Sequence, residues 1–205
     1  MAADLTTVMV THATAPVEDV LGTVGRALQG GLTAVIVRRP HANAREVYDL
    51  TRQLRPATRR FNCRLIVNDR LDVALTADAD GVHLGERSIP IAAARRILRA
   101  DMLLGCSTHD FDAAARREKE GADYVLLGSI FPTSSHPGEA GIGTEHLREA
   151  VLRTKIPVVA IGGIDPTNVR HIVRAAAAGA AAISAYSDAP DPAAVARALR
   201  AAFAR

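Results

Sequence analysis

The chain has no tryptophan, only two cysteines and only two lysines among its 205 residues. The cysteines, Cys63 and Cys106, each lie in an apolar segment and lack the spacing of a metal-ligand pair. We therefore expect two buried thiols and neither a disulfide nor a metal site at these positions. The lysines are Lys119 and Lys155, so arginine supplies the rest of the positive charge, and a site that needs a cation must draw mainly on arginine.

Long hydrophobic runs are also missing. The longest, around Leu103 and Val158, extend over only a few residues, and the N-terminal segment lacks the basic region of a signal peptide. The net charge is +3, but basic and acidic residues are interleaved along the expected helices, as in residues 116–120, which indicates a solvated surface. We therefore expect a cytoplasmic protein that binds neither a membrane nor nucleic acid.

What the sequence does contain is a regular alternation of short apolar runs and stretches of helical periodicity. The pattern predicts eight strands, at roughly residues 5–11, 33–38, 63–68, 79–84, 102–106, 123–127, 157–161 and 180–185. It predicts a helix after each, at roughly residues 17–29, 43–58, 69–76, 90–99, 110–120, 144–153, 166–177 and 191–203. This order favours an α/β fold, a single (β/α)8 TIM barrel that occupies residues 1–205 as one domain, over an open doubly wound sheet.

Internal similarity supports a barrel. Residues 79–85 (ADGVHLG) and residues 122–128 (ADYVLLG) resemble each other at a separation of 43 positions, and residues 179–183 are a weaker echo. Each marks the point where a helix leads into a strand, so the repeat unit is one or two βα units. The alternative is that such turns recur in any α/β protein.

The active site of a TIM barrel lies at the carboxyl ends of its strands. After the seventh expected strand, Gly162 and Gly163 lack side chains, which lets backbone N–H groups approach an oxyanion, and Asp165 then caps a helix. With Ser187 at the end of the eighth strand, the glycines predict a phosphate site. A plain Gly-Gly turn is the alternative.

Two further segments follow strands at the same rim. Asn68 can donate to a phosphate and Asp69 is an oxygen ligand suited to Mg²⁺, so the pair suits a magnesium-diphosphate complex; a helix N-cap is the alternative. Residues 129–143 form the longest connection and are rich in Ser, Thr, Gly and Pro. Such a loop is typical of an active-site lid, with a mobile surface loop as the alternative.

Taken together, these segments resemble the thiamine-phosphate synthases and their TenI paralogues over almost the whole chain. The resemblance rests on Arg38 and on residues 68–70, 81–85, 105–109, 121–125, 131–133 and 161–164. It implies a TIM barrel of thiamine biosynthesis that binds thiazole phosphate. In the synthases, magnesium holds the diphosphate of a hydroxymethylpyrimidine, the diphosphate leaves, and the thiazole nitrogen captures the pyrimidine methylene cation.

The resemblance also implies roles for individual residues. Arg38, Asn68 and Ser107 match diphosphate-binding positions, and Asp69 matches a magnesium ligand. The thiazole-phosphate pocket is matched by Thr133, Ser135, Gly163 and Ser187, beside Gly162. The implied partners are small phosphorylated thiazole or pyrimidine ligands, and association into homo-oligomers stays open.

The sequence departs from the synthases at several of their diphosphate contacts. Their Gln-x-Arg-x-Lys pattern reads Ile36 to Pro40 here, Ser88 replaces the second magnesium aspartate, and His136 replaces a lysine of the long loop. Losing one such contact to a departing diphosphate costs roughly 10²- to 10³-fold in rate. Three side chains nearby in sequence offer substitutes: Arg39, Arg87 and Glu86.

TenI proteins lack much of the same pattern and catalyse tautomerisation of a thiazole carboxylate phosphate, which needs a positioned acid or base. Their catalytic histidine after the sixth strand corresponds to Ser129 here. Histidine titrates near neutral pH, so the rim histidines can take the role, with a structural role as the alternative. The histidines are His83, His109 and His136. Our catalytic candidates are His136, His83, Ser129 and Ser107.

Three hypotheses follow. The first is a TenI-like enzyme acting on thiazole phosphate, either a tautomerase or a diverged paralogue. The second is a thiamine-phosphate synthase, a transferase, with rearranged contacts and with one of the two family magnesium ligands. The third is a non-catalytic protein that binds a phosphorylated ligand.

Overall fold

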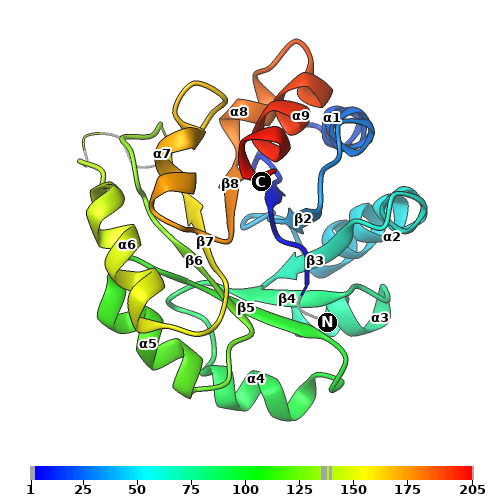
Figure 1. The fold of residues 1–205 in the computed structure, drawn as a ribbon. Helices are drawn as coiled ribbons and strands as arrows, with labels where there is room; N and C mark the ends of the chain where they lie inside the picture. The colour runs from blue at the N-terminus through cyan, green and yellow to red at the C-terminus, as the bar shows by residue number, and fades with distance from the viewer. Residues whose placement is uncertain (1–2, 135–137, 139, 205) are drawn as a thin grey trace.

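The structure is a computed structural model that describes residues 3–134, 138 and 140–204. Eight parallel strands follow one another around a closed barrel in chain order, and helices surround the barrel (Figure 1). The first strand pairs with both the second and the eighth, which closes the ring. The predicted (β/α)8 TIM barrel is confirmed.

Most elements lie close to their predicted positions. The strands are β1 Thr7–Val10, β2 Ala34–Val37, β3 Arg64–Asn68, β4 Gly81–Leu84, β5 Leu103–Thr108, β6 Tyr124–Leu127, β7 Val158–Ile161 and β8 Gly179–Ala182. The helices are α1 Val17–Gln29, α2 Ala44–Arg60, α3 Leu71–Thr76, α4 Ile91–Ile97, α5 Phe111–Lys119, α6 Gly143–Arg153, α7 Val169–Arg174, α8 Ser184–Ser187 and α9 Pro192–Phe203. Across the described part of the chain, every helix is too short or too polar to cross a membrane.

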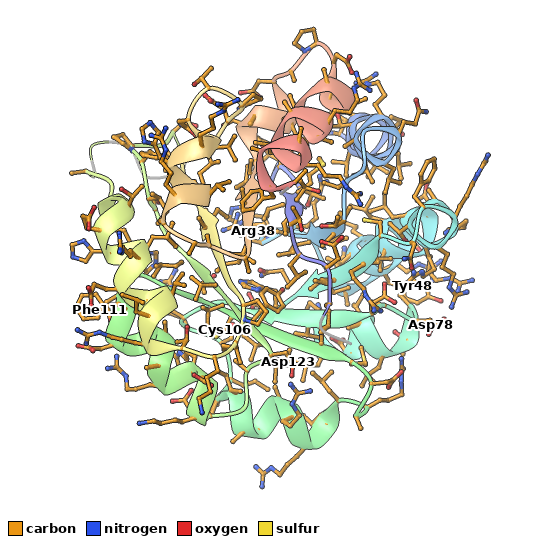
Figure 2. The ribbon with its side chains drawn as sticks, viewed as in Figure 1. Arg38, Tyr48, Asp78, Cys106, Phe111 and Asp123 are labelled. Atoms are coloured by element: carbon orange, nitrogen blue, oxygen red, sulfur yellow. The ribbon has the colours of Figure 1, made fainter. Side chains whose placement is uncertain are left out.

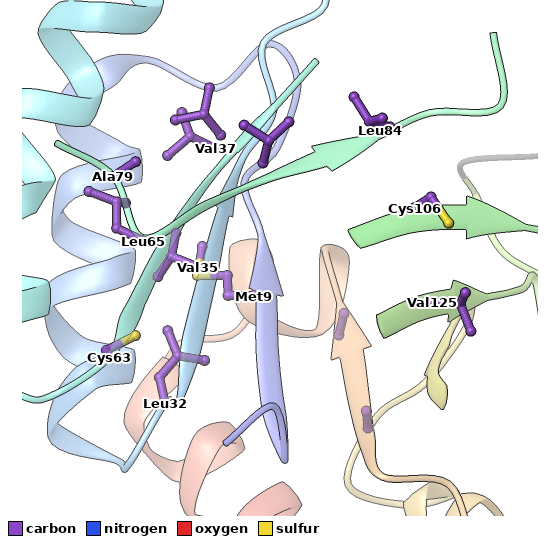
Figure 3. Packing of buried hydrophobic residues seen from close by; sticks show 14 of the residues in the cluster. Met9, Leu32, Val35, Val37, Cys63, Leu65, Ala79, Leu84, Cys106 and Val125 are labelled. Atoms are coloured by element: carbon purple, nitrogen blue, oxygen red, sulfur yellow. The ribbon is translucent and has the colours of Figure 1, made fainter. Parts of the chain in front are cut away.

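Buried apolar side chains form two clusters, one on each side of the strand wall. Alternate strand residues, such as Ile36 and Leu126, face the interior of the barrel. The intervening residues, such as Val35, pack between the strands and the surrounding helices (Figure 3). Cys63 and Cys106 belong to this outer cluster as buried free thiols, as predicted.

The repeat in the sequence corresponds to two βα units. Directly before β4, Oδ2 of Asp80 accepts hydrogen bonds from a backbone N–H of β3 at 2.7 Å and from Arg55 of α2 at 2.8 Å. Directly before β6, Oδ2 of Asp123 accepts from a backbone N–H of β5 and from Arg95 of α4, both at 2.7 Å. In two successive parts of the barrel, the aspartate before an even-numbered strand therefore links that strand to the preceding odd-numbered strand and to a helix.

A backbone hydrogen bond extends this repeat around the ring. The residue directly before each even-numbered strand donates its N–H to a carbonyl of the preceding odd-numbered strand, at 2.7 to 3.0 Å. The four donors are Thr33, Asp80, Asp123 and Ala178. The repeat unit is therefore two βα units, and the sequence echo fades before β8 because alanine stands in the place of the aspartate.

The structure corrects the prediction at the eighth strand. The sequence predicted a strand to residue 185 with Ser187 at its end, but β8 ends at Ala182 and the chain turns into the short helix α8. Tyr186 of α8 is fully buried, so the apolar pattern continues past the strand and resembles a longer one. Ser187 is consequently the last residue of α8.

A second correction concerns the segment after β7. The sequence predicted a helix from residue 166 capped by Asp165, but α7 begins at Val169. The Asp165 carboxylate instead accepts from the backbone N–H and the hydroxyl of Thr167, at 2.7 and 2.6 Å. The side chain thus closes a tight turn next to the two glycines and does not cap the helix.

Candidate functional site

Three predicted diphosphate-binding residues point toward the barrel axis at the carboxyl-terminal rim. Arg38 and Asn68 each lie two positions after a barrel-facing isoleucine, and Ser107 lies two positions after Gly105. Because side chains alternate along a strand, all three share the inner face; Figure 2 shows Arg38 inside the ring of strands. The Arg38 backbone is anchored to Thr11 of the neighbouring β1–α1 connection, whose Oγ1 accepts from its N–H at 2.9 Å and donates to its carbonyl at 3.1 Å. The structure therefore brings these three candidates to one site.

Ser107 is held from behind by a buried histidine. Its Oγ lies 2.9 Å from Nε2 of His83, and Nδ1 of His83 lies 3.1 Å from the hydroxyl of Tyr124. His83 is 2% exposed, and burial lowers the pKa of its imidazole to about 4. The ring is therefore neutral near pH 7 and engaged at both nitrogens. We expect this catalytic candidate to orient Ser107, without direct contact with a ligand.

Asp69 is exposed at the rim and bonded to the loop after β4. Its Oδ1 accepts from the backbone N–H of Gly85 at 3.0 Å and from the hydroxyl of Ser88, and its Oδ2 accepts from the amide of Asn68 at 2.7 Å. Helix α3 takes Arg70 as its N-cap, with no side-chain hydrogen bond to the helix. The alternative interpretation of Asn68 and Asp69 as helix caps is therefore wrong.

The donors around Asp69 fit magnesium in part. Mg²⁺ is a hard cation that takes oxygen ligands, and it is commonly held by one or two carboxylates, with phosphate oxygens and water completing the shell. In the portion of the chain that is described, no three Asp, Glu, His or Cys side chains are close enough to form a metal site by themselves. Oε2 of Glu86, the candidate replacement carboxylate, lies 3.6 Å from Nε2 of His109. The donor set therefore fits magnesium only where a bound ligand supplies further oxygen atoms.

Gly162 and Gly163 form a turn packed against the loop after β6. Their φ angles are +101° and +62°, a region that favours glycine. A Cβ on Gly162 would lie 2.5 Å from Cβ of Ser129, and a Cβ on Gly163 would lie 2.4 Å from the Pro132 carbonyl oxygen. Both glycines are thus required by local geometry, whether or not an anion binds there.

The end of β8 presents a different serine from the one predicted. Ser187 lies at the far end of α8 and donates its hydroxyl to the Asp188 carboxylate at 2.7 Å. Ser184 is exposed at the first position of α8, where backbone N–H groups have no carbonyl partner within the helix. Ser184 therefore occupies the place that the sequence assigned to Ser187. The sequence missed it because α8 was not predicted.

The remaining candidates lie in the loop after β6. Ser129 and Thr133 are partly exposed, on the same side of the barrel as the glycine turn. Ser135 and His136 lie outside the described residues, so their roles stay predictions.

The residues that replace the synthase contacts do not all face the site. Ile36, in place of the glutamine, is buried in the barrel interior, and Pro40, in place of the lysine, is exposed. Arg39 donates through Nη1 to the carbonyl of Ala15, which ties it to the loop after β1. Arg87 is exposed on the loop after β4, close in sequence to Ser88. The described cation that points into the barrel mouth from β2 is therefore Arg38.

The chain matches known proteins over most of its length. The thiamine-phosphate synthase of Moorella thermoacetica is 46% identical over 176 residues, which are 85% of this chain and 83% of that protein. The thiamine-phosphate synthase of Pyrococcus furiosus is 44% identical over 168 residues, 82% of this chain and 81% of that protein. A solved structure described as thiamine phosphate pyrophosphorylase from Pyrococcus furiosus superposes with a TM-score of 0.88 at 39% identity, covering 98% of this chain and 96% of that one.

The family match covers nearly all of the barrel. Residues 7–186, from the start of β1 to α8, match the family model described as thiamine monophosphate synthase. The match includes the rim segments described above as far as Tyr186 of α8, and it ends before Ser187 and Asp188. This chain therefore belongs to the thiamine monophosphate synthase family, which the sequence motifs predicted.

Proposed function

We propose that this chain is a thiamine-phosphate synthase that joins a hydroxymethylpyrimidine diphosphate to thiazole phosphate and releases diphosphate. The sequence alone placed a TenI-like enzyme first; relatives of 46% identity that carry the synthase name now favour the second hypothesis. Ser129, in place of the TenI catalytic histidine, agrees with this choice. The observation that carries the proposal is the convergence of Arg38, Asn68 and Ser107 on one rim.

These three side chains would hold the diphosphate. A guanidinium binds phosphate oxygens in a bidentate fashion, and the amide of Asn68 and the hydroxyl of Ser107 add neutral donors. As the bond to the pyrimidine methylene breaks, charge accumulates on the leaving diphosphate, and donors already pointing at it stabilise that charge. With the family glutamine and lysine replaced by Ile36 and Pro40, Arg38 carries a larger share of this stabilisation.

Asp69 would hold a magnesium ion together with the diphosphate, and Ser88 or Glu86 would supply a second oxygen. When bound, the ion neutralises part of the charge of the leaving group. Asp69 is already positioned for this by the N–H of Gly85 and the amide of Asn68.

The opposite side of the rim would hold the thiazole phosphate. The glycine turn follows β7 and α8 follows β8, and these two strands are neighbours in the barrel. Phosphate sites in TIM barrels commonly use the loops after strands seven and eight. Ser129 lies against the glycine turn, and Thr133 follows Pro132, whose carbonyl also lies against it. We propose that Ser129 and Thr133 complete the pocket, to which the sequence also assigns Ser135. The two ligands would thus enter from opposite sides of the barrel mouth, with the reacting methylene and nitrogen between them.

The test is an assay with the two substrates. Purified protein is incubated with hydroxymethylpyrimidine diphosphate, thiazole phosphate and Mg²⁺, and thiamine phosphate is quantified. We expect formation at enzymatic rates, a loss of about 10²-fold or more in kcat/KM for Arg38→Ala, and a change below about twofold for Arg26→Ala on the outer surface of α1. Asp69→Asn should raise the magnesium concentration needed for half-maximal rate.

Two results would contradict the proposal. Conversion of the thiazole carboxylate tautomer without formation of thiamine phosphate would restore the TenI-like hypothesis. Thermal stabilisation by thiazole phosphate without turnover in either assay would favour a non-catalytic binding protein.

A further inference from the structure

A row of three polar side chains crosses adjacent strands inside the barrel. Tyr124 on β6, His83 on β4 and Ser107 on β5 are linked in that order, at 3.1 and 2.9 Å. Tyr124 is 1% exposed and His83 is 2% exposed, whereas Ser107 is partly exposed at the rim. The row therefore connects the apolar interior of the barrel to the candidate diphosphate site.

The fold makes specific room for this row. A Cβ on Gly105 would lie 2.0 Å from Cζ of Tyr124 and 2.5 Å from its hydroxyl oxygen. Gly105 sits between His83 and Tyr124 in register across the three strands. Any residue other than glycine at position 105 would thus displace the tyrosine hydroxyl from His83.

Hydrogen-bond directions along the row follow from its buried end. Burial raises the pKa of the Tyr124 hydroxyl, so the group keeps its hydrogen. Among the described residues, Nδ1 of His83 is the partner that this hydroxyl reaches. A buried hydroxyl hydrogen without an acceptor costs about 1–3 kcal/mol, so Tyr124 donates and Nδ1 accepts.

The direction of this hydrogen bond determines which nitrogen of the His83 imidazole carries the hydrogen. A neutral imidazole carries one N–H, and with Nδ1 accepting, that hydrogen is on Nε2. Nε2 therefore donates to Oγ of Ser107. The Ser107 hydroxyl hydrogen cannot also point at Nε2, and it turns toward the rim.

We infer that Tyr124 and His83 are positioning residues that commit the Ser107 hydroxyl to donate to a ligand oxygen that carries no hydrogen, such as an anionic phosphoryl oxygen. Tyr124 contributes through its hydroxyl group as well as its apolar ring. The identification of the ligand as a diphosphate rests on the proposed function; the hydrogen-bond order does not.

The first experiment reads the histidine directly. Nitrogen-15 NMR of the histidine-labelled protein, assigned with His83→Gln, distinguishes a protonated from an unprotonated ring nitrogen. We expect His83 to be the Nε2–H tautomer in the protein, and Tyr124→Phe to mix the two tautomers. An Nδ1–H tautomer in the unsubstituted protein would overturn the inference, whatever reaction the protein catalyses.

The second experiment measures binding of inorganic diphosphate with Mg²⁺ by calorimetry. Loss of one oriented hydrogen bond predicts a rise in Kd of about 3- to 10-fold for Tyr124→Phe and for His83→Leu. His83→Gln, which can accept from Tyr124 and donate to Ser107, should restore most of the affinity. Tyr48→Phe on α2 is the matched control and should leave Kd unchanged.

Folding and function are separated by the choice of variants. Each variant is checked by its circular dichroism spectrum and urea midpoint, and Tyr124→Phe, which keeps the ring, serves if His83→Leu fails to fold. Unchanged diphosphate affinity in folded Tyr124→Phe would overturn the inference. If the protein binds diphosphate and shows the expected tautomer but forms no thiamine phosphate, the proposed function fails and the positioning role stands.

Discussion

Nη1 of Arg55 lies 2.8 Å from Oδ2 of Asp80, in an ion pair whose arginine side chain is only 8% exposed. The corresponding pair in the next repeat joins Nη2 of Arg95 to Oδ2 of Asp123 at 2.7 Å, and its arginine side chain is 30% exposed. The two arginine–aspartate ion pairs therefore differ mainly in how deeply the arginine is buried. Nε of Arg55 is also buried without a hydrogen-bond partner in the described structure, and Nη1 additionally donates to the Asp78 carbonyl at 3.2 Å. Among the described residues, Asp80 is the carboxylate paired with this guanidinium.

Asp80→Ala should destabilise the barrel more than Asp123→Ala. Removing Asp80 leaves a buried guanidinium without its counter-ion, which costs about 3–5 kcal/mol. Removing Asp123 breaks a half-exposed pair and one hydrogen bond to β5, which together cost about 1–2 kcal/mol. Urea unfolding of both variants measures the difference, and equal losses would show that burial of the pair has no effect.

Gly105→Ala should destabilise the protein, whereas Gly25→Ala should stabilise it. The new Cβ at residue 105 would displace the buried Tyr124 ring, and overpacking of this kind costs about 1–3 kcal/mol. Gly25 lies inside α1 with nothing within 4 Å of an added Cβ, so alanine there gains about 0.5–1 kcal/mol of helix stability. Thermal unfolding of the two variants gives the comparison; a stable Gly105→Ala variant with intact diphosphate binding would contradict the packing described for Tyr124.

The free energy of unfolding should fall between pH 7 and pH 5 because of His83. Its folded pKa of about 4 lies below the ordinary value of 6.5 because burial penalises the charged ring. Between these values the unfolded chain binds a proton that the folded chain does not, so stability is full above pH 6.5 and decreases toward pH 4. The expected loss is roughly 2 kcal/mol between pH 7 and pH 5. His83→Gln should lack this component in urea titrations at the two pH values, since the other histidines contribute equally to both proteins.

Both thiols should resist modification in the folded protein. Burial raises the pKa of Cys63 and of Cys106 to about 12, so the reactive thiolate is scarce and shielded. An aromatic disulfide reagent at pH 8 should react slowly with the native protein and label two thiols in urea. The Cys63→Ala variant keeps only Cys106, so it should react slowly without urea and label one thiol in urea. Rapid labelling of this variant without urea would mean that the outer cluster opens around Cys106.

The arrangement of strands could be predicted because it depends on short-range patterns. Apolar runs of four to six residues between helical stretches mark β1 to β7 within a few positions. The Ala-Asp pairs before β4 and β6 were visible as a repeat, although only the structure shows what each aspartate binds. The family followed from motifs spread along nearly the whole chain.

The details of the site depended on contacts that the sequence does not specify. Asn68 and Asp69 fit both a helix cap and a rim site, and the choice depends on Gly85 and Ser88, which are distant in sequence. The sequence places Ser187 at the end of β8, whereas it lies at the end of α8, because the buried Tyr186 makes α8 resemble a continuation of the strand. In the sequence, Tyr124 is simply one residue of an apolar strand, because its partner His83 lies 41 positions away.

Closure of the ring has a consequence for how the protein is made. Thr7 of β1 pairs with Ala180 of β8, and Arg200 of α9 donates to the Gly31 carbonyl at 3.0 Å, so the first and last parts of the chain complete each other. While the chain emerges from the ribosome, β1 has no partner on one side until β8 is available. Such an open strand edge invites pairing with other chains. Newly synthesised molecules should therefore be most prone to aggregation until β8, at Gly179–Ala182, has been released and can pair with β1.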